Sequence, residues 1–189
     1  MTKTLDIVGL CGSLRAASFN RMLMRLAAEC APPSMKFDLV EWRELPLFDG
    51  DLLAQGLPPS VGALRERIRR ADGVLIVTPE YNFSVPGGLK NVLDWLSRGE
   101  DQPWALKPVA IASASAGPVG GARMQYDLRK VLLYLNALVL AKPEVFVSLA
   151  QTKFDPATGQ CTDALTHKFA TDLMAAFEAW IASVGRLRG

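Results

Sequence analysis

The strongest constraint on the fold is the alternation of short apolar runs with helix-like patterns along the chain. Mainly apolar runs lie at 5–11, 37–42, 73–77, 109–115 and 145–148. Helical patterns follow them at 18–31, 63–70 (with Ser60 as N-cap), 86–97, 122–138 and 162–184. Alternation of this kind predicts parallel strands joined by crossover helices. We therefore expect an α/β fold, a doubly wound five-stranded parallel sheet with helices on both faces.

Length and charge limit the classes of partner. The 189 residues are expected to form one domain, 1–189. Lys plus Arg number 21 and Asp plus Glu 19, so no basic excess favours a nucleic-acid partner. No apolar segment approaches the roughly 20 residues of a membrane span, and the N-terminus lacks a signal-peptide pattern. These features predict a cytoplasmic protein that binds neither nucleic acid nor membrane.

The sulfur and imidazole groups do not form a metal-binding pattern. Cys11, Cys30 and Cys161 are widely spaced, and His167 is the only histidine. Without a CxxC pair or a His/Cys cluster we expect no metal and no disulfide framework. His167 is interpreted as an ordinary helix residue.

The loop after the first predicted strand has the composition of an anion site. It reads GSLRAASFN at 12–20. Backbone N–H groups at a helix start attract anions, and the side chains of Ser13, Arg15, Ser18 and Asn20 add donors. The helix that follows has no acidic residue before Glu29, which suits an anion bound at its positive end. An ordinary N-cap with a surface arginine explains this loop equally well.

Competing phosphate loops are excluded by spacing. The chain has no GxxxxGK[ST] and no GxGxxG after the first strand, so neither a P-loop nor a dinucleotide fingerprint is present. A phosphatase-type cradle needs Arg six positions after its Cys, but Arg15 follows Cys11 after four. Cys11 is instead expected to be a small buried residue at a strand end.

Two further loops are expected at the same sheet edge. The loop after 73–77 is stiffened by Pro79 and Pro86, which fix backbone torsions and remove donors. Its backbone is expected to be free of sheet pairing and to approach a flavin ring closely. The loop at 115–121 consists largely of small residues, which let a planar ligand lie against the backbone.

GSLRAASFN at 12–20 and TPEYNFSVPGGLKNVLDWLSR at 78–98 together resemble the NADPH-dependent FMN reductase family. Within it the chain is most similar to the quinone, chromate and azo-compound reductases of flavodoxin-like fold. The resemblance implies that FMN phosphate is bound by Ser13, Arg15, Ser18 and Asn20. It implies that the flavin ring is held by Pro79, Glu80, Tyr81, Asn82 and Ser84, with help from Ser115 and Gly117.

The resemblance also implies an activity. NADPH or NADH is expected to pass a hydride to bound FMN, and small-molecule acceptors (quinone, chromate, azo or flavin) then take the electrons by a ping-pong mechanism. No catalytic residue is assigned, because the chemistry belongs to the cofactor. Glu80 is expected to act through its backbone. Two alternatives stay open: a flavodoxin-type electron carrier, and a flavin-free module that binds another phosphorylated ligand.

Two predicted helices indicate self-association. In the helix at 87–98, Trp95 lies off the apolar stripe that faces the sheet and is expected to point toward a partner subunit. In the helix at 122–138, residues 131–135 are apolar all round, which is typical of a helix buried on two sides. We expect a homodimer or homotetramer assembled through these helices.

Overall fold

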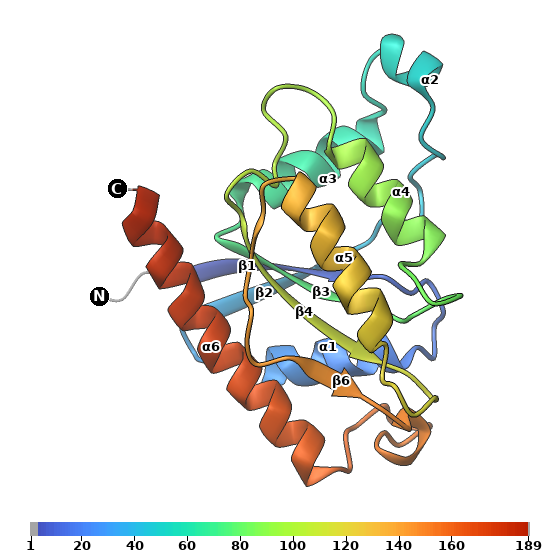
Figure 1. The fold of residues 1–189 in the computed structure, drawn as a ribbon, viewed down its shortest axis with the longest axis vertical. Helices are drawn as coiled ribbons and strands as arrows, with labels where there is room; N and C mark the ends of the chain where they lie inside the picture. Colours follow the sequence, from blue (N-terminus) through green and yellow to red (C-terminus); the bar gives the residue numbers. More distant parts are fainter. Residues whose placement is uncertain (1–3, 189) are drawn as a thin grey trace.

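The computed structural model describes residues 4–188, which form a parallel β-sheet between two layers of helices (Figure 1). The strand order is β2-β1-β3-β4-β5, and the neighbouring strands pair in parallel, as do β4 and β6. This is the flavodoxin-like order, so the predicted fold class is confirmed. The strands are β1 (Leu5–Cys11), β2 (Met35–Val40), β3 (Gly73–Val77), β4 (Pro108–Ala114), β5 (Leu138–Val139) and β6 (Val145–Val147).

The fifth position of the sheet is shared by two short strands. β5 pairs with the start of β4, and β6 pairs with its end. The strand predicted at 145–148 corresponds to β6. The first residue of β5, Leu138, falls instead at the end of the helix predicted at 122–138. That helix ends earlier than expected because Asn136 takes a left-handed backbone conformation and turns the chain into β5.

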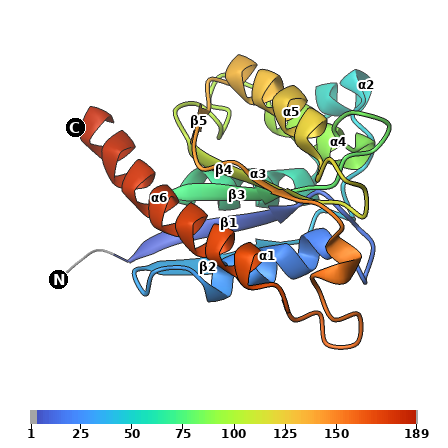
Figure 2. The ribbon, with the colours of Figure 1, turned by 60° about the horizontal axis from the view of Figure 1, so that its bottom comes forward.

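Helices cover both faces of the sheet (Figure 2). Side chains of α1 and α6 pack with Ile7, Leu75 and Ala112 on one face. Those of α3, α4 and α5 pack with Val8 and Ile76 on the other. Successive residues of β1 and β3 therefore point to opposite faces, as the pleat requires. The helices are α1 (Phe19–Glu29), α2 (Gly50–Ala54), α3 (Pro59–Arg70), α4 (Gly87–Leu96), α5 (Ala122–Tyr134) and α6 (Ala164–Arg188).

The long connection between β2 and α3 differs from the prediction. It contains α2, capped by the Asp49 carboxylate, which accepts a hydrogen bond from the N–H of Asp51. α3 begins at Pro59 after Pro58, not after Ser60, because a proline at the first helical position is pre-set for the helix. The Ser60 hydroxyl instead donates to the carbonyl of Glu44.

Trp95 is the main correction to the expected surface. Its side chain is 0% exposed, and its indole N–H donates to the carbonyl oxygen of Pro46 at 2.8 Å. The ring packs edge-on against Phe48, with 5.0 Å between centroids. Trp95 lies on the side of α4 that carries Asn91, whose amide also donates to Pro46. The connection after β2 covers that side, so no partner subunit is needed to bury Trp95.

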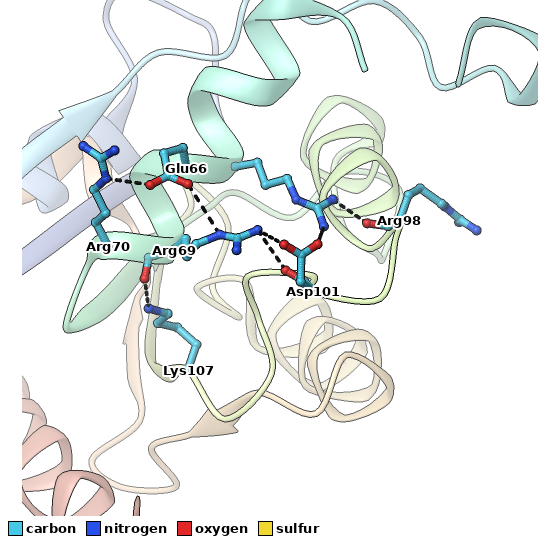
Figure 3. A network of polar contacts seen from close by, with 7 residues as sticks. Glu66, Arg69, Arg70, Arg98, Asp101 and Lys107 are labelled. Carbon is cyan, nitrogen blue, oxygen red and sulfur yellow. Dashed lines mark hydrogen bonds and ion pairs between the residues drawn. The ribbon is translucent and has the colours of Figure 1, made fainter. Parts of the chain in front are cut away.

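A charged network fastens the loop between α4 and β4 to the end of α3 (Figure 3). Asp101 accepts hydrogen bonds from Arg69 and from Arg65, whose side chain is largely buried. Lys107 donates to the carbonyl oxygens of Arg69 and Ala71 at the C-terminus of the helix, where a cation is favoured. This network lies at the edge of the sheet opposite the strand ends that carry the predicted site.

Candidate functional site

A cavity of about 180 Å³ opens where β1, β3 and β4 end. Parallel strands deliver all three following loops to one edge of the sheet, next to the point where the strand order reverses. The lining residues come from each of these loops: Ser13, Arg15, Ser18, Phe19, Asn20, Pro79, Glu80, Tyr81, Ala114, Ser115 and Ala116. The predicted convergence of three loops is present.

The first two loops lie in direct contact. A Cβ added to Gly12 would lie 1.9 Å from the hydroxyl oxygen of Thr78, far inside contact distance. The N–H of Gly12 donates to the carbonyl of Val77 at 2.9 Å, which continues the β1–β3 ladder into the loops. Glycine at position 12 is therefore required for the loops to approach this closely.

The first loop presents donors toward the cavity. The Ser18 hydroxyl caps α1 by accepting from the N–H of Asn20 at 3.2 Å, and the Ser13 hydroxyl accepts from the N–H of Arg15. Within residues 4–188, no acceptor is recorded for the backbone N–H groups of 16–18. The first turn of α1 contains no acidic residue. These unpaired donors at a positive helix end constitute an anion-binding surface.

Arg15 is exposed and bends back over its own loop. Its guanidinium donates to the carbonyl of Ala17 from Nε at 3.2 Å and from Nη2 at 2.6 Å. The guanidinium carbon lies 5.8 Å from the centre of the Phe19 ring. These contacts leave N–H groups of the fork available to an anion, and they hold the charge beside the start of α1.

Asn20 connects the first loop to the third. Its Nδ2 donates to the carbonyl of Ala114 at 2.9 Å, and its Oδ1 accepts from the N–H of Ala114 at 2.9 Å. The side chain is buried, so both polar ends of the amide are used within the protein. In this structure Asn20 contributes to the site by joining α1 to the end of β4.

The second loop is a tight hairpin turn. Tyr81 and Ser84 exchange backbone hydrogen bonds of 3.1 and 3.0 Å, and Asn82 and Phe83 between them have φ values of 49° and 69°. Positive φ at both central residues is the type I′ arrangement. The backbone groups of Tyr81 and Ser84 are thus paired with each other in an isolated bridge, outside the strands of the sheet.

Glu80 is held by a partner that the sequence did not suggest. Its carboxylate is 8% exposed, and it accepts from Nε of Arg123 at 2.7 Å and from the N–H of Met124 at 3.3 Å. The Arg123 guanidinium lies 3.8 Å from the centre of the Phe83 ring. Glu80 and Phe83, from the second loop, are thereby fastened to the N-terminus of α5. Arg123 lies in the first turn of α5, where the helix dipole disfavours a cation. This unfavourable position was the feature of the sequence that could have indicated a tertiary partner for Arg123.

The third loop is stabilised by the side chain of its own residue Ser115. The Ser115 hydroxyl accepts from the N–H of Gly117 at 3.1 Å, and the N–H of Ser115 donates to Val147 at 2.9 Å. Ser115 lines the cavity, whereas Gly117 does not. The carbonyl of Gly117 accepts from Leu149, so this residue turns toward the segment after β6.

Most of the predicted site residues therefore lie together, and three lie outside the cavity wall. Those outside are Asn82, Ser84 and Gly117. Phe19, Ala114 and Ala116 line the cavity but were not predicted, because apolar residues carry no chemical signal for a ligand.

The donor set fits the phosphate of FMN: unpaired N–H groups, two hydroxyls and a guanidinium surround a helix start that carries no carboxylate. The cavity is smaller than the roughly 300–1,000 Å³ typical of sites that enclose an entire small molecule. It therefore has room for only part of FMN, and the rest would lie outside it.

The described part of the chain supports neither a metal site nor a membrane-spanning helix. Residues 4–188 contain no group of three or more His, Cys, Asp or Glu side chains arranged to hold a metal ion. None of the described helices has the length and apolar character to cross a membrane.

A sheet of this strand order, with an anion-binding loop after β1 beside the reversal point, defines the class of flavodoxin-like FMN-binding proteins. The chain belongs to the NADPH-dependent FMN reductase family, whose model matches residues 5–152. It is accordingly an oxidoreductase that uses FMN, with NAD(P)H as electron donor.

Similar proteins match over nearly the full length. A quinone reductase of Escherichia coli is 50% identical over 186 residues, covering 97% of this chain and 99% of the relative. An NAD(P)H-dependent FMN reductase of Pseudomonas aeruginosa is 42% identical and covers 100% of both chains. The solved structure of FerB, a flavoenzyme NAD(P)H:(acceptor) oxidoreductase from Paracoccus denitrificans, has a TM-score of 0.86 at 35% identity, covering 95% and 98%.

Proposed function

We propose that the chain is an NAD(P)H-dependent quinone reductase that works by a ping-pong mechanism, with chromate, azo compounds and free flavin as further acceptors. The observation that carries the quinone assignment is the 50% identity to a quinone reductase over almost the whole of both chains. A single domain spanning 1–189 and a cytoplasmic location are part of the same proposal.

Residue roles follow from the contacts. Ser13, Arg15 and Ser18 bind the FMN phosphate together with the N–H groups of 16–18, and Asn20 keeps this loop against β4. Pro79, Glu80, Tyr81, Asn82 and Ser84 orient the flavin ring, with help from Ser115 and Gly117.

No side chain of the cavity is assigned as an acid or base. The Glu80 carboxylate is already bound by Arg123 and the N–H of Met124, which leaves it poorly placed to exchange protons with a substrate. Hydride and electron transfer are supplied by FMN when it is bound, and the protein's role is to bind and orient.

The assembly proposal rests on α5. Leu133 and Tyr134 are 76% and 88% exposed, and they extend the apolar end of this helix into solvent. Tyr126, on the same helix, is also exposed. Exposed apolar side chains gathered on one element mark interaction surfaces. We assign this part of α5 to the interface of a homodimer or homotetramer. With Trp95 buried, α4 contributes less than its sequence suggested.

The decisive experiment is anaerobic reduction of the purified, FMN-loaded protein. Addition of NADPH should bleach the visible flavin spectrum, and a stoichiometric amount of 1,4-benzoquinone should then restore it in a second, separate step. A yellow protein that NADPH fails to bleach would be a carrier of flavodoxin type. A protein that cannot be loaded with FMN would refute the site itself.

A further inference from the structure

A thiol and an imidazole from distant parts of the chain meet at the protein surface. Cys30 follows α1 as its C-cap residue, and His167 lies in the first turn of α6. The Cys30 sulfur is 3.4 Å from Nδ1 of His167. At this distance the imidazole can take the thiol proton while the sulfur attacks an electrophile, which is the arrangement of an activated nucleophile.

The pair has no part in the FMN site. α1 begins at the phosphate loop and Cys30 follows its other end, so the two are separated by the length of the helix. At 1.5 Å per residue, this is about 16 Å. A chemical role for the pair would therefore be separate from cofactor binding.

The other two thiols of the chain donate to backbone carbonyl oxygens, although Cys161 lines the same surface depression as His167. The Cys11 thiol donates to the carbonyl of Ser13, and burial raises its pKa. The Cys161 thiol donates to the carbonyl of Asp163, and burial raises its pKa as well. His167 is the only histidine in the sequence, so neither has an imidazole of its own. Both serve as internal controls.

A surface depression of about 560 Å³ lies beside His167 and gives room for a small reagent, although Cys30 itself does not line it. His167 and Cys161 form part of its wall. The acidic groups of the wall are already bonded: Asp163 accepts from the N–H and hydroxyl of Thr166, and Asp172 pairs with Lys168. Lys168 balances the charge of Asp172, but Thr166 is neutral and leaves the charge of Asp163 in place, so the depression favours a neutral molecule over an anion.

We propose that Cys30, with His167 as its base, is a covalent modification site for neutral α,β-unsaturated carbonyl electrophiles, of which 1,4-benzoquinone is a small cyclic example. The choice of a quinone as the reagent met in solution rests on the proposed function. The reactivity of Cys30 and His167 does not depend on the proposed function.

The reaction balances without a further reagent. The Cys30 S–H bond breaks and its proton passes to His167, while the sulfur forms a C–S bond to a ring carbon of the quinone. The displaced electron pair moves onto a carbonyl oxygen, which takes the proton from His167. Loss of the ring C–H proton and protonation of the second oxygen leave a hydroquinone thioether, so the quinone ring is reduced as the thiol is alkylated.

The test is labelling of the full-length, FMN-loaded protein with stoichiometric 1,4-benzoquinone in the absence of NAD(P)H. Intact mass and peptide mapping should show one quinone adduct per chain, on the peptide that carries Cys30. Cys30→Ser should abolish this fast adduct, whereas Cys11→Ser and Cys161→Ser should retain it. His167→Gln should slow labelling at Cys30 by at least about tenfold, because the general base is lost.

Two outcomes would overturn the proposal. One is preferential labelling of Cys11 or Cys161, and the other is an unchanged labelling rate in His167→Gln that keeps the wild-type circular dichroism and thermal midpoint. NADPH-dependent quinone reduction is measured separately on the same variants and should be unchanged in Cys30→Ser. Loss of labelling specificity would leave the reductase assignment intact, and absence of reductase activity would leave the labelling result intact.

Discussion

Asn20 and Ala114 are joined by two hydrogen bonds of 2.9 Å that use both polar ends of the asparagine amide. The pair connects the N-terminus of α1 to the last residue of β4, and so ties the first loop of the site to the third. Both residues line the cavity. The shape of the FMN site therefore depends on a bond between groups 94 positions apart.

Replacing Asn20 with alanine should destabilise the protein and weaken FMN binding together. The change leaves the N–H and carbonyl of Ala114 without partners, which costs about 1–3 kcal/mol in the free energy of unfolding. Denaturant unfolding of the apoprotein and FMN titration measure the two effects. Gln151→Ala removes an exposed amide that makes no hydrogen bond within residues 4–188, and it should leave both measurements unchanged. Equal behaviour of the two variants would contradict the role given to Asn20.

Arg15→Ala tests the phosphate contact. Loss of one charge-assisted hydrogen-bonding group should weaken FMN binding roughly ten- to a hundred-fold. Riboflavin has no phosphate, so its affinity should hardly change. Arg25→Ala, which removes an exposed arginine from α1, should affect neither ligand. If riboflavin and FMN lose affinity equally in Arg15→Ala, the arginine acts by shaping its loop rather than by binding phosphate.

Trp95 should behave as a core residue. Trp95→Ala should lower the free energy of unfolding by about 3–5 kcal/mol, because a large buried ring is removed. Trp95→Phe retains most of the packing against Phe48 and loses the hydrogen bond to Pro46, so it should cost about 1 kcal/mol. Chemical denaturation measures the free energy of unfolding of each variant and distinguishes the two expected losses. A change in assembly without a change in stability would restore the interface role that the sequence suggested.

Leu133→Glu tests the assembly surface on α5. A charge placed on this exposed apolar side chain should disfavour association, because it would be buried without a partner in the interface. Sedimentation analysis over a range of concentrations should show a smaller species than the wild type. Leu165→Glu, on the exposed surface of α6, is the matched control and should leave the assembly unchanged. A wild-type sedimentation profile for Leu133→Glu would place the interface elsewhere.

The stability provided by Asp101 should depend on pH. Its pKa is lowered by hydrogen bonds from Arg69 and then from Arg65. A carboxyl group with a lowered folded-state pKa contributes stability above its unfolded pKa of about 3.9, and this contribution is lost as the pH falls through the folded value. Asp101→Asn should therefore unfold more readily than the wild type at pH 7, and the difference should shrink below about pH 4. Thermal midpoints measured from pH 3 to pH 7 check this, with Asp172→Asn as a control for an exposed ion pair.

The position of the site was readable from the sequence because it depends on chain order. Apolar runs alternating with helices imply a parallel sheet, and parallel strands send the loops after β1, β3 and β4 to one edge. The 12–20 and 78–98 segments resemble the NADPH-dependent FMN reductase family, and this resemblance assigned a phosphate and a flavin ring to that edge. These inferences use information that lies within a few residues of each position.

Tertiary structure decided what each side chain touches. The helical pattern put Trp95 on the side of Asn91, but only the folded chain brings Pro46 and Phe48 to cover it. Glu80 received a partner, Arg123, from an element 43 positions away. Such pairings depend on packing between segments that no local periodicity connects. The sequence by itself thus determined the fold and the family and predicted the sheet edge of the proposed site, whereas the three-dimensional packing determined which residues line the cavity and which hold the loops together.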